Sequence, residues 1–264
     1  MLSSPRPAYQ QLAQPQAVRA VFFDVGFTLL APHPSVPEVV MNVCARRGVV
    51  LERACLDAQL PQAEALFAQL THTDLHIWGD ERAIAGIWRT YFTELLRPCL
   101  IAAGEDVLRA CADDAQRAFD EASAYALYPD VHATLAALKA RELTLGVISD
   151  WGVNLAMILR HHDLTQYFDF AVISAALRRA KPDPELFRTA LQRADAIPDY
   201  AIHVGDSYVR DVLGARSVGV TGVMIDRTSL TRPTDVDCPL IYDLYDLLDL
   251  LEIARPAAAS SLVE

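Results

Sequence analysis

The 264-residue sequence is poor in lysine, in closely spaced cysteines and in long apolar runs. Basic residues number 23 against 34 acidic ones, for a net charge of −11, which argues against a general nucleic-acid or membrane surface. The five cysteines show no C-x-x-C spacing, so we expect reduced thiols and no disulfide framework or zinc knuckle. No stretch reaches the roughly 20 apolar residues of a membrane span, and none at the start resembles a signal peptide. We therefore expect a cytoplasmic protein, monomeric or homodimeric.

Two kinds of hydrophobic pattern divide the chain. Residues from about 35 to 125 place apolar side chains at three- and four-residue spacing, which predicts helix after helix. The remainder alternates short runs rich in β-branched residues with helical patterns, which indicates a parallel sheet with helices on both faces. The first strand is the run that ends at Asp24, and further strands are predicted at 143–149, 169–174, 200–205 and 220–225, with helices near 131–141, 152–162, 184–194 and 208–217. A last short strand and a closing helix follow.

These patterns predict an α/β, Rossmann-like parallel sheet with an inserted all-helical domain. The core would comprise residues 19–34 and 126–253, and the insertion residues 35–125, with linkers near 31–35 and 127–130. Residues 1–18 would form an N-terminal extension and residues 254–264 a flexible tail. The first strand would be central in the sheet.

Polar residues stand where the predicted strands end. Ligands of open parallel sheets lie beyond the carboxyl ends of the strands, and at or near those ends this chain carries Asp24, Thr28, Ser149, Asp150, Lys181, Asp206 and Asp211. Lys181 is one of only two lysines against 21 arginines, so a compact ammonium at this place indicates a role that a planar guanidinium fills poorly. Each residue also has a purely structural interpretation: Asp24 and Thr28 suit a turn, Ser149 and Asp150 a helix cap, and "KPDP" a helix start.

Four motifs in order, "FFDVGFTLL", "VISD", "KPDP" and "VGDSYVRD", resemble those of the haloacid dehalogenase superfamily of hydrolases. The resemblance covers about residues 19–250, with the helical block as the cap of that family. It implies that Asp24 is a nucleophile that attacks phosphorus, with Lys181 neutralising charge and Thr28 and Ser149 donating hydrogen bonds. It also implies Mg²⁺ held by Asp24, the Gly26 carbonyl, Asp206 and Asp211, and a small phosphorylated molecule as substrate.

Gly26 departs from the pattern of the family. Its phosphatases usually carry a second aspartate at this place, which protonates the leaving group, and glycine cannot do so. Asp150 is the nearest substitute by position, and Trp151 is placed to touch a ligand. A glycine here also raises the expectation of a positive φ. Three functions stay open: an Mg²⁺-dependent phosphatase, a 2-haloacid dehalogenase-type hydrolase of carbon–halogen bonds, and a catalytically weak binding or regulatory protein.

Overall fold

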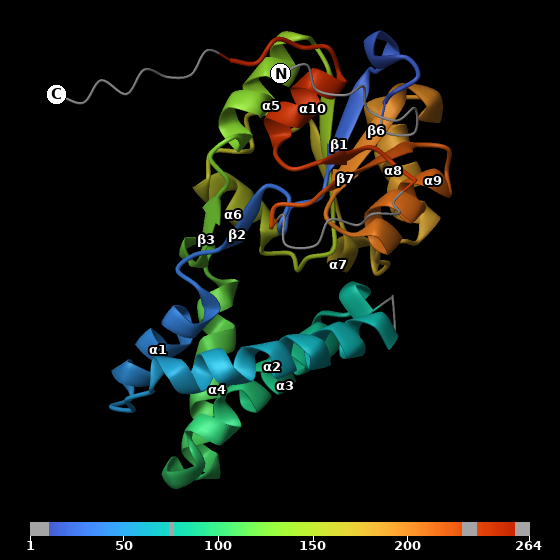
Figure 1. Ribbon diagram of the computed structural model, residues 1–264. Coiled ribbons are helices and arrows are strands. Elements are labelled where there is room, and N and C mark those ends of the chain that lie inside the picture. The colour runs from blue at the N-terminus through green and yellow to red at the C-terminus, as the bar shows by residue number, and fades with distance from the viewer. Residues whose placement is uncertain (1–10, 74–76, 229–236, 257–264) are drawn as a thin grey trace, which may run out of the picture.

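The computed structural model describes residues 11–73, 77–228 and 237–256 (Figure 1). A six-stranded sheet, in which every neighbouring pair is parallel, has the order β5-β4-β1-β6-β7-β8. Its strands are β1 (Ala20–Phe23), β4 (Thr144–Ser149), β5 (Phe170–Ile173), β6 (Ala201–Gly205), β7 (Thr221–Ile225) and β8 (Leu240–Ile241). The predicted α/β fold with a central first strand is confirmed. Among the described helices, none is both long and apolar enough to cross a bilayer.

Helices cover both faces of the sheet because its strands are apolar on both sides. Val21 and Phe23 of β1 pack into the core under one set of helices, whereas Ala20 and Phe22 pack under the other. The first set is α5 (Val131–Ala140), α6 (Leu155–His161) and α10 (Leu244–Leu250), and the second is α8 (Pro184–Ala194) and α9 (Gly214–Arg216). Burying one such side chain contributes about 1.5–3 kcal/mol, so the two layers together fix the sheet.

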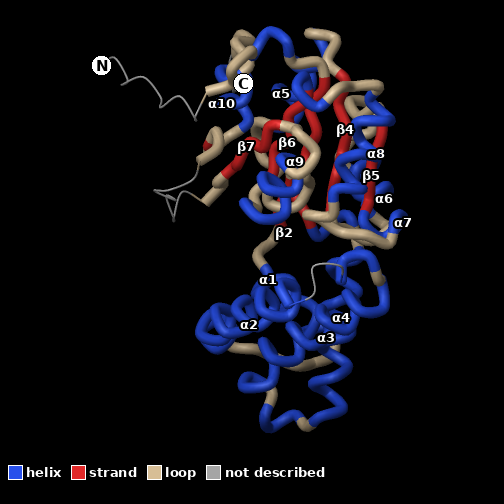
Figure 2. The backbone as a smooth tube through the Cα atoms, turned by 90° about the vertical axis from the view of Figure 1, so that its right-hand side faces the viewer, coloured by secondary structure: helices blue, strands red, loops and turns tan. Residues whose placement is uncertain are grey.

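The inserted helices form a second body with its own hydrophobic core (Figure 2). They are α1 (Val36–Arg46), α2 (Arg53–Thr73), α3 (Glu81–Leu96) and α4 (Glu105–Asp120). Phe92 and Leu95 are fully buried between them. α1 begins with a capping box, in which Ser35 and Glu38 satisfy each other's backbone N–H groups. Below, the helical body means α1 to α4 with the short helices between them.

A small antiparallel ribbon forms at the two predicted linkers and overlaps them only in part, at residues 31–32 and 127. β2 (Leu30–Pro32) and β3 (Tyr125–Leu127) pair in register, and the His33 N–H donates to the Ala124 carbonyl at 2.8 Å. Figure 1 shows this ribbon between the sheet and the helical body. Each strand has only three residues, too few for an alternating pattern, and its partner lies far away in sequence. The ribbon was therefore not predictable from local sequence.

The expectation that all thiols are reduced is wrong for one pair. Cys55 of α2 is bonded to Cys99 in the short helix η4 (Arg97–Cys99), with Cα atoms 5.9 Å apart. The two positions are 44 residues apart in sequence, and only the packing of α2 along α3 brings them together. Cys44, Cys111 and Cys238 are free and buried.

The structure also refines the predicted helices. The segment predicted at 208–217 starts as a π-helix, η8 (Tyr208–Leu213), before α9. α7 (Ser174–Leu177) is a single turn between β5 and Lys181. Single turns of 3-10 helix lie at η2 (Pro15–Ala17), η3 (Ile77–Gly79), η5 (Ile101–Ala103), η6 (Ala122–Ala124) and η7 (Pro198–Tyr200).

Candidate active site

Three of the predicted side chains meet at the carboxyl edge of the sheet. Asp24 directly follows β1, Ser149 ends β4 on one side, and Asp206 directly follows β6 on the other. The Asp24 N–H donates to the Val204 carbonyl at 2.9 Å, which extends the ladder between β1 and β6. The Ser149 hydroxyl donates to Asp24 Oδ1 at 3.0 Å. Both residues are buried, so the sheet itself fixes the carboxylate.

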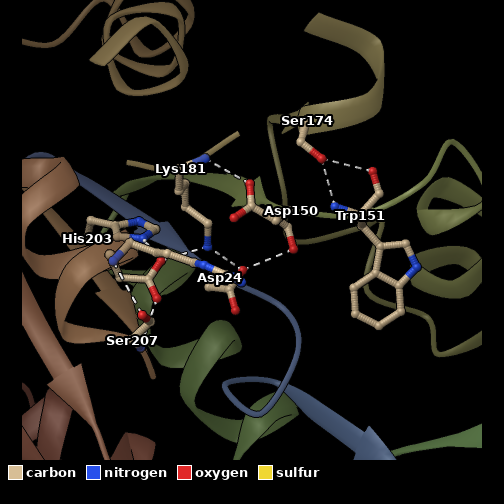
Figure 3. A network of polar contacts seen from close by, with 10 residues as sticks. Asp24, Asp150, Trp151, Ser174, Lys181, His203 and Ser207 are labelled. Carbon is tan, nitrogen blue, oxygen red and sulfur yellow. Dashed lines mark hydrogen bonds and ion pairs between the residues drawn. The ribbon is translucent and has the colours of Figure 1, made fainter. Parts of the chain in front are cut away.

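Lys181 joins two carboxylates at the centre of the site (Figure 3). Its Nζ lies 2.7 Å from Asp24 Oδ1 and 2.6 Å from Asp211 Oδ1, and the residue is only 2% exposed. Burial would lower the pKa of Lys181, but the charges of Asp211 and Asp24 outweigh it and raise that pKa. The lysine is therefore positively charged, as its rarity in the sequence led us to expect.

Asp211 is held from three sides. Besides Lys181, its carboxylate accepts hydrogen bonds from the Ser207 N–H at 3.0 Å and lies 2.8 Å from His203 Nε2. Burial opposes ionisation, but Lys181 and His203 outweigh it and lower the pKa of Asp211. A Cβ on Gly205 would lie 2.2 Å from Asp211 Cγ, so only glycine lets the carboxylate pack against the strand end.

His203 is the contributor that we missed in the sequence. It is fully buried in β6, edge-on to Phe187 with ring centroids 5.2 Å apart. The only signal was a lone polar residue in the apolar run "AIHVG", two places before Gly205. Its contact with Asp211 identifies it as a support for that carboxylate.

The acidic residues fit a hard divalent cation. Asp24, Asp206 and Asp211 each offer an oxygen, and these oxygens lie within 4.8 Å of one another. Burial and the charges of Asp24 and Asp211 raise the pKa of Asp206 to about 8. This raised pKa reflects burial and the crowding of three carboxyl groups around one lysine, and a cation with oxygen ligands would favour their ionised form.

Gly26 lies against an aromatic ring. A Cβ built at this position would lie 3.3 Å from Cζ3 of Trp151. The positive φ that we expected at Gly26 is instead found at the next residue, Phe27, with φ of 52°. The space that a second aspartate would enter is thus bordered by Trp151, which itself packs edge-on to Tyr125 at 5.3 Å.

Thr28 and Asp150 each present a buried oxygen for which no partner lies in the described part of the chain. These atoms are Thr28 Oγ1 and Asp150 Oδ2. Asp150 Oδ1 accepts a hydrogen bond from the Lys181 N–H at 2.9 Å, so Asp150 positions the lysine backbone. Burial raises the pKa of Asp150 to about 7, and the charges of Lys181 and Arg210 both oppose that rise. The Thr28 carbonyl is held by Arg227, which also pairs with Asp130.

Known proteins resemble this chain over most of its length. A model of the haloacid dehalogenase-like hydrolases matches residues 18–219. Haloacid dehalogenase-like hydrolase domain-containing protein 3 of Danio rerio is 31% identical, over 84% of this chain and 90% of its own. The chain belongs to the haloacid dehalogenase-like hydrolases. The family predicted from four motifs is confirmed, and so is the prediction that the protein is a hydrolase.

Further matches of this haloacid dehalogenase-like hydrolase include a phosphatase. Phosphoserine phosphatase from Thermus thermophilus is 31% identical, over 83% of this chain and 92% of its own. The crystal structure of a HAD-hydrolase from Bacillus subtilis bound to magnesium superposes with a TM-score of 0.71 at 17% identity, over 89% of this chain and 99% of that one. At 17% identity, this structural match shows the fold alone.

Proposed function

We propose that this haloacid dehalogenase-like hydrolase is an Mg²⁺-dependent phosphatase, which cleaves a small phosphorylated metabolite through an aspartyl-phosphate. The observation that carries the proposal is the Asp24 carboxylate, buried at a strand end, bonded to a charged lysine and set among two further acids. The phosphatase among its 31%-identical relatives supports the same reaction class. Acidic groups buried this close together are costly unless cations neutralise them.

The two oxygens of the Asp24 carboxylate would have different tasks in the reaction. Asp24 Oδ1 accepts from both Ser149 and Lys181, which leaves Oδ2 to attack phosphorus. A bond forms between Asp24 Oδ2 and phosphorus as the bond from phosphorus to the leaving oxygen breaks, and that oxygen takes a proton from water. A second water then attacks phosphorus and gives its proton to solvent, the bond between Asp24 and phosphorus breaks, and inorganic phosphate departs as the Asp24 carboxylate is restored. Lys181, Ser149 and Thr28 donate hydrogen bonds in both steps.

Mg²⁺ would be held by Asp24, Asp206 and Asp211, with the Gly26 carbonyl as a backbone ligand. When bound, it neutralises the repulsion between the carboxylate and the phosphoryl oxygens. The donors present, all oxygens, suit this ion and not a soft metal.

Hydrolysis of 4-nitrophenyl phosphate by the purified protein tests this proposal. We expect activity with Mg²⁺, none in excess chelator, and none in Asp24→Asn. Asp206→Asn should weaken Mg²⁺ binding, measured by titration calorimetry. Asp113→Asn, a change of the same kind on the helical body, is the matched control. Full activity in chelator would contradict the metal-dependent mechanism and favour carbon–halogen chemistry.

A further inference from the structure

Two buried N–H donors meet where the helical body touches the core. Trp78 Nε1 and Arg210 Nε are both shielded from solvent, and neither has a hydrogen-bond partner within the described ranges. The Arg210 guanidinium lies over the Trp78 ring, 5.5 Å from its centroid. An unsatisfied buried donor costs about 1–3 kcal/mol, so two of them at one contact point to an acceptor from outside the described chain.

These donors border the reaction site. Arg210 immediately precedes Asp211, on the π-helix that follows β6. Ser174 Oγ donates a hydrogen bond to the Trp78 carbonyl at 2.8 Å and accepts one from the Trp151 N–H at 3.0 Å. Figure 3 shows Ser174 holding the backbone of Trp151, whose ring stands against Gly26. One donor thus comes from the helical body and one from the core, on segments that adjoin Asp211 and Trp151 of the site.

Among the residues that the structure describes, no carboxylate lies within ion-pair distance of Arg210. Its Nη2 donates to a backbone oxygen, that of Thr71, at 3.3 Å. Arg216 of the core pairs with Asp237, whereas Arg193, which among the described residues also bonds only to a backbone oxygen, is exposed to solvent. What distinguishes Arg210 is that its Nε is buried and has no partner in the described part of the chain, and in a protein with a net charge of −11 such a guanidinium calls for an anion.

We propose that Arg210 and Trp78 bind the carboxylate of a phosphorylated carboxylic acid, while Asp24 and Lys181 engage its phosphoryl group. The proposal rests on the phosphatase function above and names its substrate class. Nε–H and the second hydrogen of Nη2 form the side edge of the guanidinium, which matches the two oxygens of a carboxylate. The indole N–H adds a third donor.

Charge favours a carboxylate over the other groups that could accept these bonds. A hydroxyl would leave the guanidinium uncompensated, and a second phosphate would bring about two negative charges to one cation. A carboxylate brings one. Because one donor belongs to the helical body, its binding would also tie that body to the core.

Matched phosphonates, which no phosphatase step can hydrolyse, test the subsite by binding alone. Titration calorimetry with Mg²⁺ compares 3-phosphonopropionate with propylphosphonate, which has the same chain length without the carboxylate. We expect the native protein to prefer the former by at least about tenfold, the size of a charge-assisted hydrogen bond. Arg210→Gln should reduce the preference to about onefold. Arg210→Lys and Trp78→Phe should each reduce it to an intermediate value. Trp88→Phe, in the same aromatic cluster, should leave it intact.

The outcomes separate this inference from the proposed phosphatase activity. Equal affinity for the two phosphonates, no affinity for either, or a preference that survives Arg210→Gln would overturn the subsite. Tighter binding of ethylene-1,2-bisphosphonate than of 3-phosphonopropionate would overturn its assignment to a carboxylate. An Arg210-dependent preference in a protein that hydrolyses no phosphate ester would support the subsite and refute the phosphatase function.

Discussion

The Trp151 ring stands against the one position of the first motif that has no side chain. With a contact of 3.3 Å from a Cβ at residue 26, the ring would have to shift by a few tenths of an ångström for even an alanine. Its backbone is held by Ser174 and its ring by Tyr125. The lack of an acid at residue 26 and the Trp151 ring beside that position are therefore linked. A phosphatase with this arrangement would depend on how readily its leaving group departs.

Turnover should accordingly fall as the leaving group becomes more basic. A phenolate departs almost unaided, whereas an alkoxide needs a proton. Gly26→Asp alone should raise turnover of alkyl phosphates by less than tenfold, because Trp151 obstructs the new carboxyl. In the Trp151→Leu background the same change should approach the roughly 10²–10⁴-fold of general acid catalysis. Steady-state kinetics on aryl and alkyl esters measure both gains. Equal native rates on the two esters would contradict this account.

Asp150 should make stability depend on pH. Its pKa rises from 3.8 to about 7 on folding, chiefly through burial. The folded state therefore binds more protons between these values, and stability falls with rising pH across this window, by at most about 4 kcal/mol. Asp150→Asn keeps an oxygen for the Lys181 N–H and removes the titration. Urea denaturation in EDTA from pH 4.5 to 8 should show the native protein losing stability relative to the variant. A difference in unfolding free energy between the two proteins that stays constant over this pH range would refute the role of Asp150.

At the scale of elements, the Cys55–Cys99 bond ties the start of α2 to the turn after α3. Closing a loop of 44 residues restricts the unfolded chain, which corresponds to about 2–4 kcal/mol. We expect the Cys55→Ala, Cys99→Ala double variant to unfold at lower denaturant by that amount. Reductant should destabilise the native protein and leave the variant unaffected, which is the control. Equal stability with and without reductant would contradict the role of this bond.

Long and regular elements were predictable because their pattern is local. The strand before Asp24 and the helix at Pro184–Ala194 carry their own apolar periodicity and their own end signals. β2 and β3 are the opposite case, since neither has a pattern without the other. The disulfide depends in the same way on the packing of α2 against α3.

The same division holds in the site. Asp24, Ser149, Lys181 and Asp206 could be placed together because parallel strands bring their carboxyl ends to one edge. His203 and Trp78 could not, since the first acts through a residue eight places away and the second through contact between two bodies. Residues that touch across the helical body and the core leave no spacing in the sequence.

At the scale of the molecule, the helical body and the sheet have separate hydrophobic cores, which should respond separately to cavities. Phe92 is fully buried in the core of the helical body. Phe187 is fully buried in the layer between the sheet and the helices α8 and α9. Phe92→Ala should cost about 3–5 kcal/mol and speed amide hydrogen exchange in α1 to α4. Phe187→Ala is the matched control and should speed exchange in β1 and α8 instead. Uniform acceleration by either variant would show one cooperative unit.

The ribbon of β2 and β3 has a topological consequence. Both chain crossings between the two bodies pair with each other, and His33 bonds directly to Ala124. The whole helical body is thus the loop of a β-hairpin. A tight turn joining residues 32 and 125 would close the same hairpin. The six-stranded sheet could therefore carry a different inserted domain, or none, while every strand keeps its neighbours.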